Sequence, residues 1–83
     1  MTASDAQTLL DRVREALADA TPLPPSEIRA ESELVGELGL SSLELVMLFG
    51  RLEAAFGVRF GEDDLTGIRT VEDVVMLIRR LQR

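Results

Sequence analysis

Apolar side chains recur every three or four residues in three stretches of this sequence, at residues 4–20, 41–56 and 70–83. This spacing places apolar groups along one face of an α-helix. No stretch alternates apolar and polar residues for long enough to predict a β-strand. The sequence therefore predicts an all-α fold, a small helical bundle with three main helices.

Prolines and glycines separate these stretches. Three prolines between residues 21 and 25 end the first helix, because proline lacks an amide donor and keeps the preceding residue out of the helical region. A long loop follows between the first and second helices, and we expect its apolar residues to pack on the bundle: Ile28, Leu34, Leu38 and Leu40. Gly57 ends the second helix, and residues 62–65 predict one short helix before the last main one.

A polar capping residue begins each main helix. Ser4 with Gln7, three residues later, predicts a capping box on the first helix. Ser41 with Glu44 predicts another capping box, immediately before the long apolar run of the second helix. Thr70 is the expected N-cap of the last helix, which has acidic residues in its first turn and arginines near its end, as the helix dipole favours.

The second helix has more apolar surface than one small core requires. We assign one face to the core: Leu45, Leu48, Phe49, Leu52, Ala55 and Phe56. A second apolar set projects from the other side and is available to a partner: Leu43, Val46, Met47 and Ala54. Gly50 is unfavourable inside a helix, which indicates either tolerated strain or the close approach of another surface.

The composition restricts the chemistry that this chain can perform. At 83 residues it is long enough for one domain, spanning residues 1–83, and too short for a large catalytic pocket. It has no Cys and no His, which removes thiol nucleophiles, imidazole bases and Cys/His zinc sites. The acidic run of Glu62, Asp63 and Asp64 is interpreted as a solvated helix N-terminus. We therefore expect neither an enzyme nor a metal site.

The negative charge is concentrated in the middle of the chain. The net charge is −6, and residues 31–64 contain eight acids and two arginines, whereas acids and arginines balance elsewhere. Such a segment repels phosphate backbones and attracts basic protein surfaces, although it also serves simply to keep a small protein in solution. We expect no nucleic-acid partner. The first 20 residues include Asp5, Asp11 and Asp19, which predicts no signal peptide or membrane span and a cytoplasmic location.

Residues 37–44, with the sequence Glu-Leu-Gly-Leu-Ser-Ser-Leu-Glu, resemble the attachment segment of the acyl carrier protein family, which includes the carriers of polyketide and nonribosomal peptide synthesis. The similarity extends over nearly the whole chain, including the long loop, the Phe56-Gly57-Val58 helix exit and the start of the last helix at Thr70. The resemblance implies a 4'-phosphopantetheine arm, derived from coenzyme A, on Ser42. A phosphodiester there would lie at the first position of a helix, where anions are favoured.

The same resemblance implies a function. It implies a discrete, monomeric carrier that holds acyl or aminoacyl intermediates as thioesters and presents them to partner enzymes in a specialised secondary-metabolite, lipid or aminoacyl pathway. The implied partners are a phosphopantetheinyl transferase, an acyl- or aminoacyl-activating ligase, and downstream synthase or transferase enzymes. The alternative is a carrier-derived helical interaction module that is not modified.

This sequence departs from the family pattern beside the proposed attachment site. Ser41 stands where most members have Asp, a residue that the resemblance implies contacts the transferase. Glu44 and Glu53 match acidic positions of fatty-acid carriers, whereas Met47 and Ala54 replace acids. The expected partner-docking residues form one set along the second helix: Ser41, Leu43, Glu44, Met47, Glu53 and Ala54.

Overall fold

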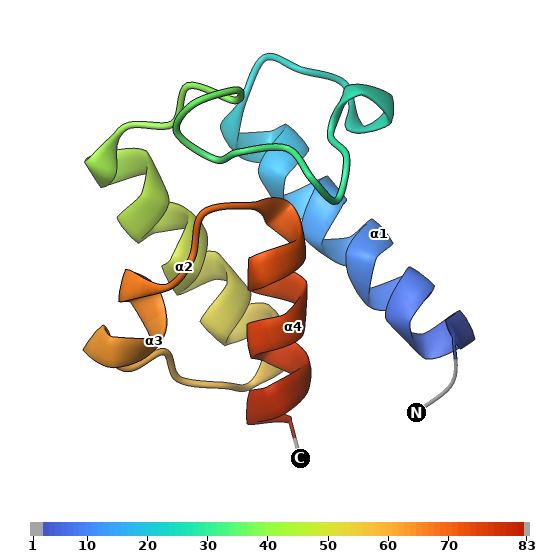
Figure 1. The fold of residues 1–83 in the computed structure, drawn as a ribbon, viewed down its shortest axis with the longest axis vertical. Coiled ribbons are helices and arrows are strands. Elements are labelled where there is room, and N and C mark those ends of the chain that lie inside the picture. Colours follow the sequence, from blue (N-terminus) through green and yellow to red (C-terminus); the bar gives the residue numbers. More distant parts are fainter. Residues whose placement is uncertain (1–2, 83) are drawn as a thin grey trace.

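Four α-helices and one short 3-10 helix make up residues 3–82, the part of the chain that the computed structural model describes, with side chains from residue 7 onward (Figure 1). The elements in chain order are α1 (Ala3–Ala20), η1 (Pro25–Glu27), α2 (Ser42–Phe56), α3 (Glu62–Thr66) and α4 (Val71–Leu81). Within these residues the only β-type pairing is an isolated bridge between Glu33 and Thr70. The predicted all-α bundle is confirmed, including its three main helices and the short α3.

The three long helices enclose one apolar core. α1 packs against both α2 and α4, and α4 lies across the front of the other two in Figure 1. The buried side chains come from all three long helices and from the loop before α2: Leu9, Val13, Leu17, Ile28, Leu34, Leu40, Leu48, Leu52, Val71, Val74, Val75 and Ile78. The expectation that the long loop packs on the bundle is therefore confirmed, with Leu38 partly buried beside the three buried loop residues.

Two expectations about helix residues are wrong. α1 begins at Ala3, so Ser4 lies inside the helix, and the Gln7 amide donates to Asp11 Oδ1 one turn further on (3.3 Å). Periodicity fixes a helix end only to within one or two residues, which is why this start was misplaced. Ala55 is exposed, because it lies at the edge of the core face and Phe56 makes the core contacts of that last turn.

The loop between α1 and α2 is hydrogen-bonded to two of the long helices, α1 and α4. Arg14 Nε donates to the carbonyl oxygen of Ile28 at 2.7 Å, which joins the loop to α1. The carbonyl oxygens of Ser32 and Ala30 accept from the N–H groups of Val71 and Glu72 at 3.0 and 2.7 Å, which joins it to the start of α4. Because its polar backbone groups find partners, this long loop can pack closely on the helices.

The glycine within α2 and the glycine that ends it have different roles. Gly57 ends the helix in the left-handed conformation, with φ of 66°, and its N–H donates to the Glu53 carbonyl. Gly50 is exposed, and apart from its chain neighbours and the adjacent backbone of its own helix no atom lies within 4 Å of the place where a Cβ would be, so no contact in the described chain requires a glycine there. Relative to Ala it costs about 1 kcal/mol of helix stability.

No helix in residues 3–82 is both long enough and apolar enough to cross a membrane.

Candidate functional site

Ser42 is the first residue of α2, and its side chain is exposed. Ser41 precedes it as the N-cap, with its Oγ accepting from the Glu44 N–H at 3.2 Å. In return, the Glu44 carboxylate accepts from the Ser41 N–H at 2.9 Å. The predicted capping box is confirmed, and it fixes the start of α2 without using the hydroxyl of Ser42.

The starts of α2 and α4 differ in whether their first backbone N–H groups have hydrogen-bond acceptors. Both helices have a capping box, but in α4 the loop carbonyls also accept from the N–H groups of Val71 and Glu72. The equivalent N–H groups of α2, those of Ser42 and Leu43, have no acceptor within residues 3–82. The positive end of the α2 dipole therefore faces open space beside the Ser42 hydroxyl, a position where an anion is stabilised.

The two capping boxes lower the pKa of their carboxyl groups. The backbone N–H of Ser41, followed by its hydroxyl, stabilises the ionised form of Glu44 and lowers the pKa of that side chain below its usual 4.5. Hydrogen bonds from the backbone N–H groups of Arg69 and Thr70 lower the pKa of Asp73 below 3.8 in the same way. Both groups are ionised at neutral pH, and both hydrogen-bond to the start of their helix.

These shifts predict a loss of stability in acid. Both carboxyl groups have lower pKa values in the folded chain than in the unfolded chain. Their ionised forms therefore stabilise the fold above about pH 4.5, and this stabilisation is lost as the pH falls through the lowered pKa values. We expect Glu44→Gln and Asp73→Asn each to flatten the dependence of the melting temperature on pH between 5 and 2.5. Thermal melts across that range test this. Unchanged pH profiles in both variants would contradict the assignment of the acid transition to the capping boxes.

Glu53, predicted as a docking residue, is engaged within the chain. Its side chain is half-buried, and Oε2 accepts from the N–H of Phe60 at 2.8 Å. Its backbone carbonyl also accepts from the N–H groups of Gly57 and Val58. This side chain therefore fixes the segment that leaves α2. Sequence patterns give no signal of this contact, because it depends on where the chain turns after the helix.

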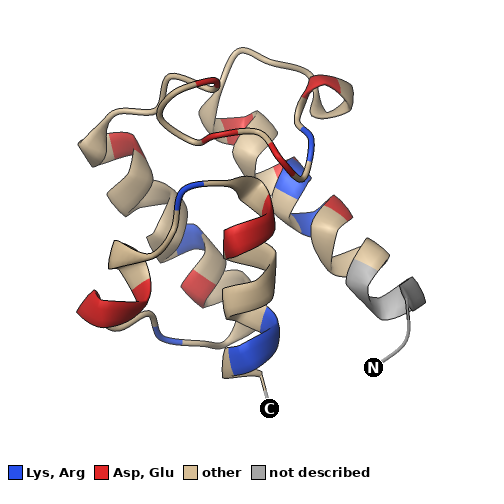
Figure 2. Ribbon diagram, viewed as in Figure 1, with Lys and Arg blue, Asp and Glu red and all other residues tan. Residues whose placement is uncertain are grey.

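The predicted apolar docking residues lie on the open side of α2. Leu43, Val46 and Met47 are 70%, 67% and 63% exposed, and Ala54 is exposed as well. In Figure 2 the middle of α2 carries few charges, whereas acidic residues mark the starts of α3 and α4 and basic residues mark the end of α4. Of the six predicted docking residues, the three apolar ones are exposed, whereas Ser41, Glu44 and Glu53 hydrogen-bond within the chain itself.

A small cavity that the sequence did not predict lies between α2, α3 and the loop, near Ser42. Its volume is about 220 Å³, and Leu45, one turn beyond Ser42, lines it together with Phe49, Leu65 and Ile68. Arg69 lies at the same cavity, and its guanidinium pairs with Glu33 at 3.4 Å. The lining comes from segments far apart in the sequence, so no local pattern could have predicted it.

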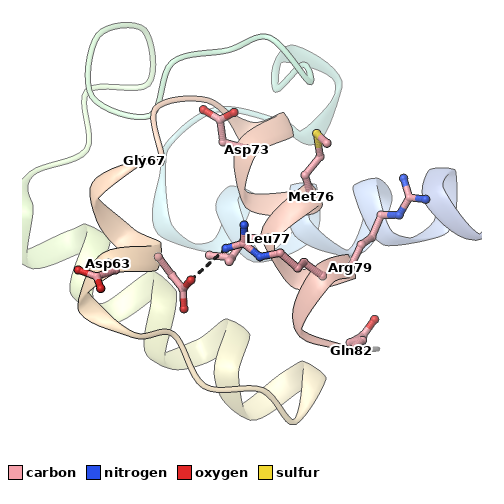
Figure 3. A pocket seen from close by; sticks show the side chains of 9 residues that line it. Asp63, Gly67, Asp73, Met76, Leu77, Arg79 and Gln82 are labelled. Carbon is pink, nitrogen blue, oxygen red and sulfur yellow. Dashed lines mark hydrogen bonds and ion pairs between the residues drawn. The ribbon is translucent and has the colours of Figure 1, made fainter.

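A larger open cavity, of about 840 Å³, lies between α3 and α4 (Figure 3). The dashed line in Figure 3 marks the ion pair between Arg80 and Asp64 (3.0 Å), which joins the two helices across it. Met76 and Leu77 contribute apolar surface. None of the residues predicted as site residues lines this cavity. Within residues 3–82, no three carboxylates come together in a way that could hold a metal ion.

Comparisons with known proteins match this chain to carriers over most of its length. The family described as "Phosphopantetheine attachment site" matches residues 11–78. The meromycolate extension acyl carrier protein of Mycolicibacterium aurum is 34% identical over 96% of this chain and 82% of that protein. The acyl carrier protein of Coprothermobacter proteolyticus is 38% identical over 87% of this chain and 88% of that protein. The chain spans only 66% of the length of the meromycolate extension acyl carrier protein of Mycobacterium leprae.

The fold comparison agrees with the sequence comparison. A solved structure from Mycobacterium tuberculosis, assigned as an acyl carrier protein, superposes with a TM-score of 0.64 and 27% identity. The match covers 93% of each chain. The likeness therefore includes the long helices as well as the loop that precedes Ser42.

Proposed function

Because this chain belongs to the acyl carrier protein family, we propose that Ser42 is the residue to which its 4'-phosphopantetheine arm is attached. The chain is a carrier of acyl intermediates, and the arm, when attached, supplies the thiol that a protein without Cys lacks. The observation that carries the choice of residue is the open start of α2. Ser42 combines an exposed hydroxyl with two N–H groups that no other described part of the chain uses.

The residues around Ser42 have separate tasks in this proposal. Ser42 provides the oxygen of the phosphodiester, and the N–H groups of Ser42 and Leu43 face its negative charge. Ser41 and Glu44 fix the first turn of the helix through the capping box, so the hydroxyl is held at a defined position. Leu45 opens onto the small apolar cavity one turn away, where apolar parts of a carried group can be shielded from water.

The relatives support a specialised lipid pathway as the setting. The Mycolicibacterium aurum relative is a meromycolate extension acyl carrier protein. On the exposed side of α2, Met47 and Ala54 stand at two positions where the family resemblance implies acids in fatty-acid carriers. We propose that the partners are a phosphopantetheinyl transferase, an acyl-activating ligase and a downstream synthase. The unmodified interaction module is the alternative that the next experiment tests.

Ser41→Asp tests whether the attachment site lacks a carboxylate that a broad-specificity transferase uses. We expect this variant to be loaded from coenzyme A several-fold faster than the wild-type chain, followed by intact mass over time. Ser41→Asn is the matched control, because Asn is an equally good N-cap without the charge. The Glu44 carboxylate already accepts from the Ser41 N–H at 2.9 Å, so a second negative charge there should add no net stability. Equal loading rates in the wild type, Ser41→Asp and Ser41→Asn would contradict a role for the missing carboxylate. If none of the three chains is loaded, the result favours the alternative function, an interaction module that is not modified.

A further inference from the structure

The small cavity near Ser42 has apolar walls and a charged mouth. Two charged residues line it, Arg69 from the link between α3 and α4 and Glu33 from the loop before α2. Their side chains are 79% and 44% exposed, which places them where the cavity opens to solvent. Among the described residues that line the cavity, Arg69 is the only cation. The apolar walls come from α2, α3 and the link after α3: Leu45, Phe49, Leu65 and Ile68.

The apolar part of this cavity is short. The Phe49 ring meets the ring of Phe60 edge to face, with centroids 5.6 Å apart and planes at 86°. The N–H of Phe60 in turn donates to Glu53 Oε2 at 2.8 Å, so the Phe49 ring is held where it lines the cavity. A cavity of about 150 Å³ accommodates one benzene molecule, so the cavity of about 220 Å³ has room for roughly six to nine carbon atoms.

The ion pair at the mouth is weak. Arg69 Nη2 donates to Glu33 Oε2 at 3.4 Å, whereas charged groups that bind firmly approach to about 2.7–2.9 Å. An exposed ion pair with this geometry contributes little to stability, so another carboxylate can replace Glu33 at little cost. The guanidinium is suited to such an exchange, because its planar donors bind a carboxylate through two N–H groups at once.

Gly36 leaves room for a carboxylate beside Arg69. A Cβ at this position would lie only 2.6 Å from Glu33 Oε1, so a side chain there would displace the carboxylate from its place. The carboxylate of Asp73 is engaged elsewhere, since it accepts from the backbone N–H groups of Arg69 and Thr70, both at 3.0 Å. The Glu33 carboxylate thus shows which kind of group fits at the mouth of the cavity.

A group carried on Ser42 would lie close to this arginine. Leu45 is one turn beyond Ser42 and lines the same cavity as Arg69. Because the group is tethered, its effective concentration there reaches the millimolar range, which favours exchange with Glu33. Resting on the attachment site proposed above, we propose that Arg69 is a specificity-determining residue that binds a carboxylate at the far end of the carried group. The chain then carries acyl groups of roughly six to nine carbons that end in a second carboxylate.

Adipoyl and hexanoyl groups provide a matched pair for the test, because both have six carbons and only adipoyl ends in a carboxylate. A broad-specificity phosphopantetheinyl transferase loads each group from its coenzyme A thioester, and peptide mass confirms the load on Ser42. We expect the adipoyl-loaded chain to melt at least about 3 °C above the hexanoyl-loaded chain. Apolar burial alone predicts the opposite order, since hexanoyl is more apolar and a net charge of −6 repels a further carboxylate.

Three variants assign the difference to Arg69. Arg69→Gln should reduce it below about 1 °C or reverse it, and the Arg69 carbonyl that accepts from the Leu34 N–H at 2.9 Å is retained. Arg29→Gln is the control, because Arg29 is also exposed and paired, with Glu31 at 3.6 Å, but lies outside the cavity lining. It should keep the full difference. Glu33→Gln should enlarge the difference, because it removes the competing carboxylate.

The outcomes separate this inference from the attachment site. A hexanoyl-loaded chain that melts at or above the temperature of the adipoyl-loaded chain would overturn the role of Arg69 and leave the attachment site standing. The same holds for a difference that persists in Arg69→Gln or is lost equally in Arg29→Gln. A chain that accepts neither group on Ser42 would overturn the attachment site, and the inference with it.

Discussion

Replacing Ser42 by alanine is expected to abolish loading of phosphopantetheine completely while leaving the fold in place. The change removes the only oxygen to which the arm could attach at this position. The capping box uses Ser41 and Glu44, so the hydroxyl of Ser42 stabilises nothing in the described chain. Alanine is also a good helix former at the first position of α2, so we expect the free energy of unfolding to change by less than about 0.5 kcal/mol.

Ser41→Ala is the matched control for that experiment. It removes the N-cap hydroxyl that accepts from the Glu44 N–H, and such a loss costs about 0.5–2 kcal/mol. Its Ser42 hydroxyl remains, so loading should continue on a less stable chain. Intact mass after incubation with transferase and coenzyme A, beside a thermal melt of each variant, distinguishes the two serines. Loading that continues in Ser42→Ala and stops in Ser41→Ala would show that the attachment residue is Ser41.

Ile28→Ala is expected to have the largest effect on stability among single changes in the loop. Ile28 is fully buried in the core between the helices, and its carbonyl oxygen accepts from Arg14. Truncating a buried Ile costs about 2–5 kcal/mol. A chain of this size has roughly 4–12 kcal/mol of stability in total, so a large share is lost. We expect the melting temperature to fall by at least about 10 °C.

Val35→Ala is the control in the same loop. Val35 is 61% exposed, so its truncation should change the free energy of unfolding by no more than about 0.5 kcal/mol. Urea unfolding of both variants followed by circular dichroism measures the difference. Similar small effects at both positions would mean that the loop is not part of the core, contrary to the structure.

Local patterns in the sequence were sufficient to predict most of the fold. The start of α2 at Ser42, its capping box, its end at Gly57 and the start of α4 after Thr70 all depend on residues within a few positions of each other. The failures lie where local signals are weak. Ser4 was misplaced at a helix end that periodicity does not define, and Ala55 lies at the border of the core face, where the packing of other residues decides which side chain is covered.

The surroundings of the site were less predictable than the site itself. Ser42 was predicted as the attachment residue from the family resemblance, and its exposed place at the start of α2 agrees with that prediction. The internal hydrogen bond of Glu53 to Phe60 and the cavity beside Leu45 depend on how α3 and the loop fold back on α2. The difference between the two helix starts also depends on long-range folding, because the Ser32 carbonyl of the loop accepts a hydrogen bond at the start of α4 and no loop carbonyl within residues 3–82 does so at the start of α2. These contacts join residues that are distant in the sequence, which no periodic pattern encodes.

The most direct test of the central claim is the intact mass of this protein purified from its own host, followed by fragmentation of the peptide that contains residues 41 and 42. The account predicts a chain heavier by one phosphopantetheine group, with the added mass on Ser42. An unmodified chain from a host whose transferase is present, or an added group on any other residue, would contradict it.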